Sequence, residues 1–193
     1  MRLFYAIKFN DNVKEALNNS LDEIKKHTAR ASFTEKNNFH ITLVFVGECE
    51  PDKLEDLKKV ADNTVAKLNP TPVKAVIDGL GTFPRPGDEL LWAGVKTDPE
   101  DILGKINKII VEELDGYRIK IKEDFKKFKP HVTIARRVEF RYALGRDLRQ
   151  IKFEPVNFTV KSLTLMESVQ EISVYGERKY TRIVYKPLYE VKF

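Results

Sequence analysis

Two of the three histidines in the chain stand in the same four-residue frame, in which a histidine and a threonine alternate with apolar residues. One copy reads HITL and begins at His40; the other reads HVTI and begins at His131. In a β-strand, side chains two positions apart point to the same face. His40 and Thr42 therefore share one face of a strand, as do His131 and Thr133, while the apolar residues between them face the other side.

Paired imidazoles and hydroxyls of this kind suit the hydrolysis of a phosphodiester. An unperturbed imidazole has a pKa of about 6.5, so one ring can take a proton from water while the other gives one to the departing ribose oxygen. The threonine hydroxyls can donate hydrogen bonds to the non-bridging phosphate oxygens. A single frame is more often structural, because threonine is a good strand residue, but two matched copies favour catalysis. The third histidine, His27, lies near a predicted helix end and is expected to be structural.

The elements that would position these residues follow from hydrophobic periodicity and from the turn residues between them. Strands are predicted at residues 2–9, 39–46, 73–80, 90–95, 131–135, 158–166 and 179–186. Helices are predicted at residues 13–27, from Pro51 to before Asn69, and from Pro99 to Gly116. Residues 81–88 are expected to form a loop, and a basic connector that carries Arg136 and Arg137 is expected to follow residue 135.

The order of these elements and the repeated frame predict an α+β fold of two related lobes, each a sheet with helices on its outer face. We expect residues 1–193 to form a single bilobal domain. Each histidine would lie on a central strand of its own sheet, with the two imidazoles facing across one cleft.

The composition is typical of a globular protein, with 42% hydrophobic and 33% charged residues. No apolar run approaches the roughly 20 residues needed to span a bilayer, and the opening nine residues are too short for a signal-peptide core. The single cysteine, Cys49, excludes an intramolecular disulfide and a cysteine-based zinc site. We therefore expect a cytoplasmic protein. Its net charge of +5 suits an anionic partner.

The pair HITL and HVTI resembles the signature of the two-histidine (2H) phosphoesterase superfamily. Within it, the chain is similar to the bacterial and archaeal RNA 2',3'-cyclic phosphodiesterases, also called 2'-5' RNA ligases or LigT-like proteins. The similarity extends over nearly the whole chain and includes RLFYAI, NFHITLVFVGE, GTFP, LLWAGV, KPHVTIAR and SLTLMES. The resemblance implies a bilobal α+β duplication with two antiparallel sheets facing a central cleft. It also implies hydrolysis of 2',3'-cyclic phosphate ends to 2'-phosphates, with no metal and no cofactor.

The resemblance further implies a role for each site residue. His40 and His131 would be catalytic, with His131 activating the water and His40 protonating the leaving O3'. Thr42 and Thr133 would bind the phosphate, together with Arg136, five residues after His131.

The family often carries a basic residue just before the LLWAGV-type strand, where this chain has Asp88 and Glu89. At that position the chain departs from the family, and the extra cationic contact that the family residue would give does not carry over to it. Several lysines that precede His131 could follow an RNA backbone: Lys122, Lys126, Lys127 and Lys129.

Two aromatic residues, Phe4 and Tyr5, are adjacent on the first predicted strand, so only one of them can face the cleft and stack on a base. A core position is the simpler expectation for both, and also for Trp92.

The expected partners are RNA ends that carry a 2',3'-cyclic phosphate, either tRNA fragments or oligonucleotides, bound by a monomer with no membrane contact. The nearest alternative is an enzyme of the same superfamily acting on ADP-ribose cyclic phosphates or 2'-5' oligonucleotides, or catalysing RNA ligation in the reverse direction. A second is a non-catalytic RNA-end-binding protein. A third is a two-histidine metal site, which is disfavoured because neither frame contains Asp or Glu and zinc hydrolases generally bring three protein ligands.

Overall fold

The computed structural model describes the chain except residues 69–70, 122–127, 142–147 and 176–177, and except the side chains of 173–180. Its helices are α1 (Asp11–His27), α2 (Leu54–Leu68) and α3 (Ile102–Gly116), with short 3-10 turns η1 (Lys36–Asn38), η2 (Pro51–Lys53) and η5 (Leu148–Gln150). Its strands are β1 (Arg2–Lys8), β2 (Thr28–Phe33), β3 (His40–Glu48), β4 (Val73–Arg85), β5 (Asp88–Asp98), β6 (His131–Phe140), β7 (Val156–Val160), β8 (Ser162–Tyr175) and β9 (Arg178–Lys192).

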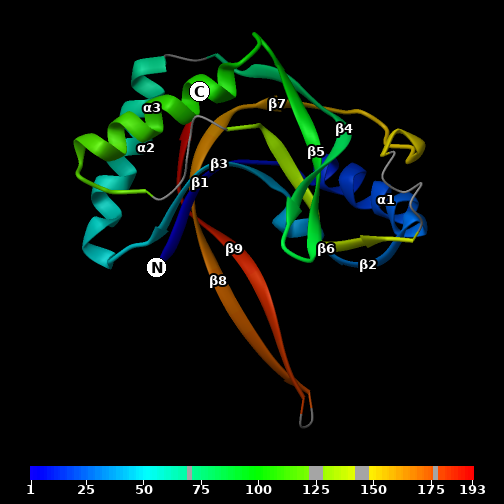
Figure 1. Ribbon diagram of the computed structural model, residues 1–193. Coiled ribbons are helices and arrows are strands. Elements are labelled where there is room, and N and C mark those ends of the chain that lie inside the picture. The colour runs from blue at the N-terminus through cyan, green and yellow to red at the C-terminus, as the bar shows by residue number, and fades with distance from the viewer. Residues whose placement is uncertain (69–70, 122–127, 142–147, 176–177) are drawn as a thin grey trace.

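The strands form one curled antiparallel sheet in the order β7-β4-β5-β6-β3-β1-β8-β9, with β2 paired to β6 (Figure 1). Its two halves meet where β3 lies beside β6, and the only Cα pair in that register, among the described residues, is Ile41 with Val132. We call β1, β3, β8 and β9 the first half, and β4 to β7 the second half. The predicted α+β arrangement of two lobes is confirmed, and the two predicted sheets are continuous through this one pair.

The helices cover the outer side of the sheet, as expected. In Figure 1, α2 and α3 lie together against one part of the sheet and α1 lies against another. α1 contacts β2 and β7, α2 contacts β8 and β9, and α3 contacts β3 and β5. Each helix buries a stripe of apolar residues at helical spacing, such as Leu17, Leu21 and Ile24 on α1. None of the helices in the described residues is long and apolar enough to cross a membrane.

The two histidine-bearing strands show the alternation that the sequence predicts. Ile41 and Leu43 on β3, and Val132 and Ile134 on β6, are buried in the helix-covered core. The histidines and threonines between them are half-buried on the opposite face.

Residues 81–88, expected to form a loop, mostly belong to the sheet, so that prediction is wrong. β4 continues to Arg85 and pairs with β5 down to the turn at Pro86-Gly87. Proline is tolerated here because β7 pairs with β4 only as far as Ile77, which leaves the later part of β4 as an edge strand where a missing N–H breaks no ladder. A stretch rich in Gly and Pro can therefore still be a strand.

Other elements also differ from the prediction, and β5, β8 and β9 are longer than expected. The strand β2 was not expected, β6 extends through Arg136 and Arg137, and the strand predicted at 158–166 breaks at Lys161 into β7 and β8. Beyond its pairing with β1, the β8–β9 hairpin projects well away from the rest of the molecule (Figure 1).

Candidate active site

One cavity of about 690 Å³ brings together all five site residues predicted from the sequence. His40 and Thr42 line it from β3, and His131, Thr133 and Arg136 line it from β6. Because the two halves of the sheet join at Ile41 and Val132, the residue next to each histidine sits at the junction and brings both histidines to the same cavity.

Both imidazoles are anchored in the same way at the start of their strands. Nδ1 of His40 lies 2.7 Å from the carbonyl oxygen of Asn38, and Nδ1 of His131 lies 2.7 Å from that of Lys129. A carbonyl oxygen can only accept, so Nδ1 carries the proton in each ring. Nε2 is therefore the nitrogen that can gain or lose a proton on both histidines.

The two Nε2 atoms differ in their contacts. Nε2 of His40 lies 2.9 Å from the hydroxyl of Thr42. When the ring is neutral, Nε2 accepts from that hydroxyl; when the ring is protonated, Nε2 donates to it and frees the hydroxyl proton for another acceptor. Nε2 of His131 makes no hydrogen bond to any residue that the structure describes.

The cavity disfavours protonation of both rings. The pKa of His40 is lowered to about 4, mainly by burial, with the Asn38 carbonyl opposing and the nearby charges of Arg136 and His131 acting in the same direction as burial. Burial also lowers the pKa of His131, with Arg136 and Lys129 acting in the same direction and the Lys129 carbonyl opposing them. At neutral pH both imidazoles are therefore uncharged in the empty cavity. An anion bound between them would raise the pKa of each.

His40 is surrounded by aromatic rings. The Phe4 ring lies 5.1 Å from the imidazole, centroid to centroid, and the Tyr185 ring meets it edge-on at 4.8 Å. Phe45 stacks on Phe4 at 6.0 Å with an interplanar angle of 8°. Of the two adjacent aromatics on the first strand, Phe4 lines the cavity. Tyr5 is in the core, where its hydroxyl donates to the Leu57 carbonyl.

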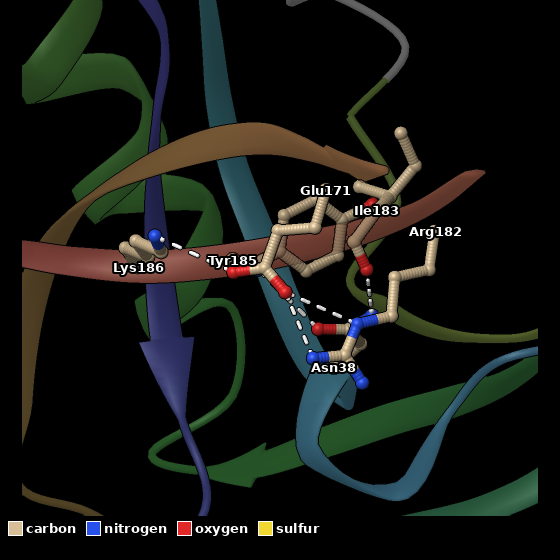
Figure 2. Close-up of polar contacts among 6 residues, drawn as sticks. All are labelled: Asn38, Glu171, Arg182, Ile183, Tyr185 and Lys186. Atoms are coloured by element: carbon tan, nitrogen blue, oxygen red, sulfur yellow. Dashed lines mark hydrogen bonds and ion pairs between the residues drawn. The ribbon is translucent and has the colours of Figure 1, made fainter. Parts of the chain in front are cut away.

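Asn38 connects His40 to the β8–β9 hairpin, and Figure 2 shows its contacts with Ile183 and Tyr185 on β9. Its side-chain amide donates to the Ile183 carbonyl at 2.6 Å and accepts from the Tyr185 N–H at 3.3 Å. Its own carbonyl holds Nδ1 of His40. The same residue therefore orients the imidazole and the strand that carries Tyr185.

Neither Asn38 nor Tyr185 was predicted from the sequence. The position of Asn38 two residues before His40 could have suggested the backbone contact, since Lys129 precedes His131 in the same way. Nothing local marks the contact between Asn38 and β9, because it joins residues 145 and 147 positions apart. The same hairpin also carries an exposed ion-pair network, in which Glu171 holds Arg182 and Lys186 (Figure 2).

His131 has a different environment. Phe83 meets its ring edge-on at 5.2 Å, and Trp92 approaches it at 6.3 Å. Trp92 is buried, as expected, and its indole lies so close to Gly81 that a Cβ there would be 2.1 Å from a ring carbon, which only glycine permits. The Lys129 Nζ lies 4.0 Å from the Trp92 ring centroid.

The lining of the cavity is strongly cationic. It includes Arg2, Arg85, Lys129 and Arg136, and no described lining residue is Asp or Glu. Of the lysines expected to follow an RNA backbone, Lys129 lines the cavity; the other three, Lys122, Lys126 and Lys127, lie outside the described residues. Arg137 donates to the Ser32 hydroxyl and does not line the cavity.

Two further observations concern metal ligands and the third histidine. In the part of the chain that the structure describes, no three His, Cys, Asp or Glu side chains are grouped as metal ligands would be. His27 lies 3.5 Å from Glu23 on α1, a local contact away from the cavity.

Comparison with known proteins extends these observations. A family model described as the 2'-5' RNA ligase superfamily matches residues 13–171. An RNA 2',3'-cyclic phosphodiesterase of Thermotoga maritima is 27% identical over 195 residues, covering 100% of this chain and 96% of that protein. One from Archaeoglobus fulgidus is 31% identical over 137 residues, covering 70% of this chain and 72% of that protein.

Solved structures have the same fold. The protein TT0787 of Thermus thermophilus aligns with a TM-score of 0.67 at 24% identity, covering 100% of this chain and 97% of that one. E. coli LigT complexed with 3'-AMP aligns with a TM-score of 0.68 at 22% identity, covering 99% of this chain and 97% of that one.

Proposed function

The chain belongs to the 2'-5' RNA ligase superfamily, and from that premise we propose that it hydrolyses 2',3'-cyclic phosphates at RNA ends to 2'-phosphomonoesters. The observation that carries the proposal is the shared cavity: two imidazoles with the same anchored Nδ1 present Nε2 to one space, beside two threonines and an arginine. Relatives named RNA 2',3'-cyclic phosphodiesterase, and a nucleotide monophosphate in the E. coli structure of the same fold, support this substrate class.

His131 is the general base in this scheme. Its Nε2 is neutral in the empty cavity and faces no competing donor among the described residues. It takes a proton from a water molecule as the water oxygen bonds to phosphorus. Attack occurs opposite O3', so the P–O3' bond breaks and the phosphate remains on O2'.

His40 is the general acid. Its Nε2 gives a proton to the departing O3', which leaves as a free 3'-hydroxyl. Protonation of His40 requires the substrate, because burial holds the pKa of the empty site at about 4 and the bound anion raises it. Once the Nε2–H is directed to O3' it no longer donates to Thr42, whose hydroxyl is then free to donate to a phosphate oxygen.

The developing charge on the phosphate is held by Thr42, Thr133 and Arg136. Hydroxyl and guanidinium donors directed at the non-bridging oxygens stabilise the transition state more than the ground state, because negative charge accumulates there during attack. Acid, base and oxyanion donors are then all side chains of this chain, and the scheme requires no Lewis acid.

The test uses purified protein and an oligonucleotide that ends in a 2',3'-cyclic phosphate. We expect a 2'-phosphomonoester, identified by its resistance to a 3'-specific phosphatase, and unchanged turnover in excess EDTA. Tight binding without turnover would indicate an end-binding protein, and loss on chelation with rescue by zinc or manganese would indicate a metal site. Turnover of ADP-ribose cyclic phosphate or 2'-5' oligonucleotides alone would reassign the substrate within the family. Incubation of product ends with a 5'-hydroxyl RNA tests the reverse ligation.

A further inference from the structure

Resting on the proposed function, we propose that Arg2, held over the ring of Phe45, is a second phosphate-binding site. It would bind the phosphodiester on the 5' side of the terminal nucleotide. The substrate class would then be an oligonucleotide end, and a cyclic mononucleotide would occupy only part of the cavity.

The first argument is the excess of positive charge. A cyclic phosphate is a diester and carries one negative charge. Four cationic side chains line the cavity, and none of them forms an ion pair with an acidic residue in the part of the chain that the structure describes. Arg136 is close enough to lower the pKa of both histidines, so it serves the reacting phosphate. The other cations remain available to further phosphates.

The second argument is the position of Arg2 on β1. Where β1 pairs with β3, Ala6 is the Cα partner of Thr42 and Phe4 is that of Phe45. Arg2 comes next on the same face of β1 and is the Cα partner of Glu48. Arg2 is thus two residues farther from His40 than Phe4, which is about 7 Å along a strand. Ring contacts run from His40 through Phe4 to Phe45, on which this arginine lies.

The third argument is the contact that holds the Arg2 side chain. Its guanidinium carbon lies 5.1 Å from the Phe45 ring centroid. A cation–π contact uses none of the guanidinium N–H groups as hydrogen-bond donors, and these N–H groups match two oxygens of a phosphate. The ring therefore restricts the arginine without using its hydrogen-bond donors.

The remaining cations are weaker candidates for this site. Lys129 lies over Trp92 beside His131, next to the reacting phosphate. Arg2 and Arg85 are both exposed, but Arg85, at the β4–β5 turn, is not held against any ring among the described residues. Of the four cationic lining residues, Arg2 alone combines a contact with an aromatic ring with distance from the histidines.

The experiment compares two substrates that differ by one nucleotide. Adenosine 2',3'-cyclic phosphate lacks an upstream phosphodiester, and the dinucleotide ApA ending in the same cyclic phosphate has one. Arg2→Ala should lower kcat/KM on the dinucleotide about tenfold, mainly through KM, as expected for one charge-assisted contact. The mononucleotide should be hydrolysed at the wild-type rate. For the dinucleotide, the slope of log kcat/KM against log salt concentration should become less negative by about 0.7.

Two matched arginine variants complete the design. Arg30→Ala, on β2 outside the cavity, makes the same change in net charge and should affect neither substrate. Arg85→Ala tests the other end of the cavity. A selective dinucleotide defect in Arg85→Ala and not in Arg2→Ala would overturn the assignment, as would an equal defect of Arg2→Ala on both substrates or no defect at all.

A binding measurement separates this proposal from the enzymatic one. The 2'-phosphate products of the same two substrates are titrated against wild type and Arg2→Ala. A selective loss of dinucleotide affinity supports the Arg2 site even if the wild type hydrolyses neither cyclic substrate, an outcome that would refute only the proposed reaction. Equal affinities of wild type and Arg2→Ala for the dinucleotide product would refute the site.

Discussion

The two halves of the sheet hold their histidines in the same frame and by the same Nδ1 anchor, yet they surround them with different chemistry. His40 is enclosed by Phe4 and Tyr185 and is connected to the β8–β9 hairpin through Asn38. His131 lies at the more basic end of the cavity, beside Lys129 and Arg136.

The difference is clearest five residues after each histidine. That position is Phe45 in the first half and Arg136 in the second. In the first half, the cation at this level is Arg2 from the neighbouring strand, which rests on the Phe45 ring. The two halves thus share the histidine and the threonine of each frame and differ in the residue five positions after the histidine.

This comparison predicts that the two histidines are needed equally, although their surroundings differ. His40→Ala and His131→Ala should each lower kcat by roughly 10²–10⁴, because each removes one proton-transfer group. The double variant should be little worse than the more damaging single one, since acid and base act in one step. Release of the 2'-phosphomonoester measures the effect.

His27→Ala is the control, because that ring contacts Glu23 on α1 outside the cavity. A folded His40 or His131 variant with near wild-type turnover would contradict two-histidine catalysis.

The sequence predicted the shared part of the two halves better than the part that differs. Strict alternation around His40 and His131 identifies both strands and the face each histidine occupies, because the period of a strand is two. Family resemblance, confirmed by the family model, adds Arg136. The structure places these residues around one cavity.

The contacts that distinguish the halves depend on long-range pairing. Asn38 meets β9 only because the hairpin folds back beside β1. Arg2 reaches Phe45 only through the register of β1 with β3, which contains two irregularities. Local patterns carry no information about either contact. The error at residues 81–88 has a similar cause, since whether a Gly- and Pro-rich stretch can be a strand depends on which neighbours it has.

Removal of the Arg136 charge from the second half should give the next largest effect on activity. Arg136→Ala should lower kcat/KM by about 10- to 100-fold, because a charge-assisted contact to the phosphate is lost. Arg136→Lys should recover part of the loss, since lysine keeps the charge but not the planar pair of donors. Kinetics on a cyclic mononucleotide measure the effect, because no second phosphate contributes there.

Arg137→Gln is the matched control from the adjacent position, where the side chain bonds Ser32 outside the cavity. An equal loss in Arg136→Ala and Arg137→Gln would show that net charge, and not contact, is responsible.

Loss of the Asn38 contacts in the first half should have a smaller effect on turnover. Asn38→Ala removes the two hydrogen bonds to β9 and loosens both Tyr185 and the loop whose carbonyl holds His40. We expect kcat to fall about three- to tenfold with little change in KM, and stability to fall by about 1–3 kcal/mol. Steady-state kinetics and thermal unfolding give the two readouts.

Asn38→Asp sharpens the test, because a carboxylate can accept from the Tyr185 N–H but cannot donate to the Ile183 carbonyl. Its loss should be similar to that of alanine. Asn37→Ala, an exposed neighbour, should be neutral. Lower stability with unchanged kcat in Asn38→Ala would mean that the Asn38 side chain supports the hairpin and not His40.

The last prediction concerns the pH at which the rate is maximal. Activity requires one neutral and one protonated imidazole, so kcat/KM is bell-shaped: acid inactivates by protonating the base, and alkali by deprotonating the acid. The folded cavity lowers the pKa of His40 to about 4 and also lowers that of His131. Both limbs of kcat/KM, which reports the free enzyme, should therefore lie below the ordinary histidine value of about 6.5. The two apparent values belong to the coupled pair.

Bound substrate is an anion and raises both pKa values, so the kcat profile should lie at higher pH than the kcat/KM profile. Removing Arg136 should move the kcat/KM bell in the same direction, because its charge lowers the pKa of both rings. Lys129→Gln should move it less, since among the causes of the lowered pKa values Lys129 acts on His131 alone. A wild-type kcat/KM optimum at or above pH 7 would contradict the lowered pKa values. A rate that rises to a plateau through high pH would mean that no protonated histidine acts as the acid, and the two halves would then not divide the proton transfers between them.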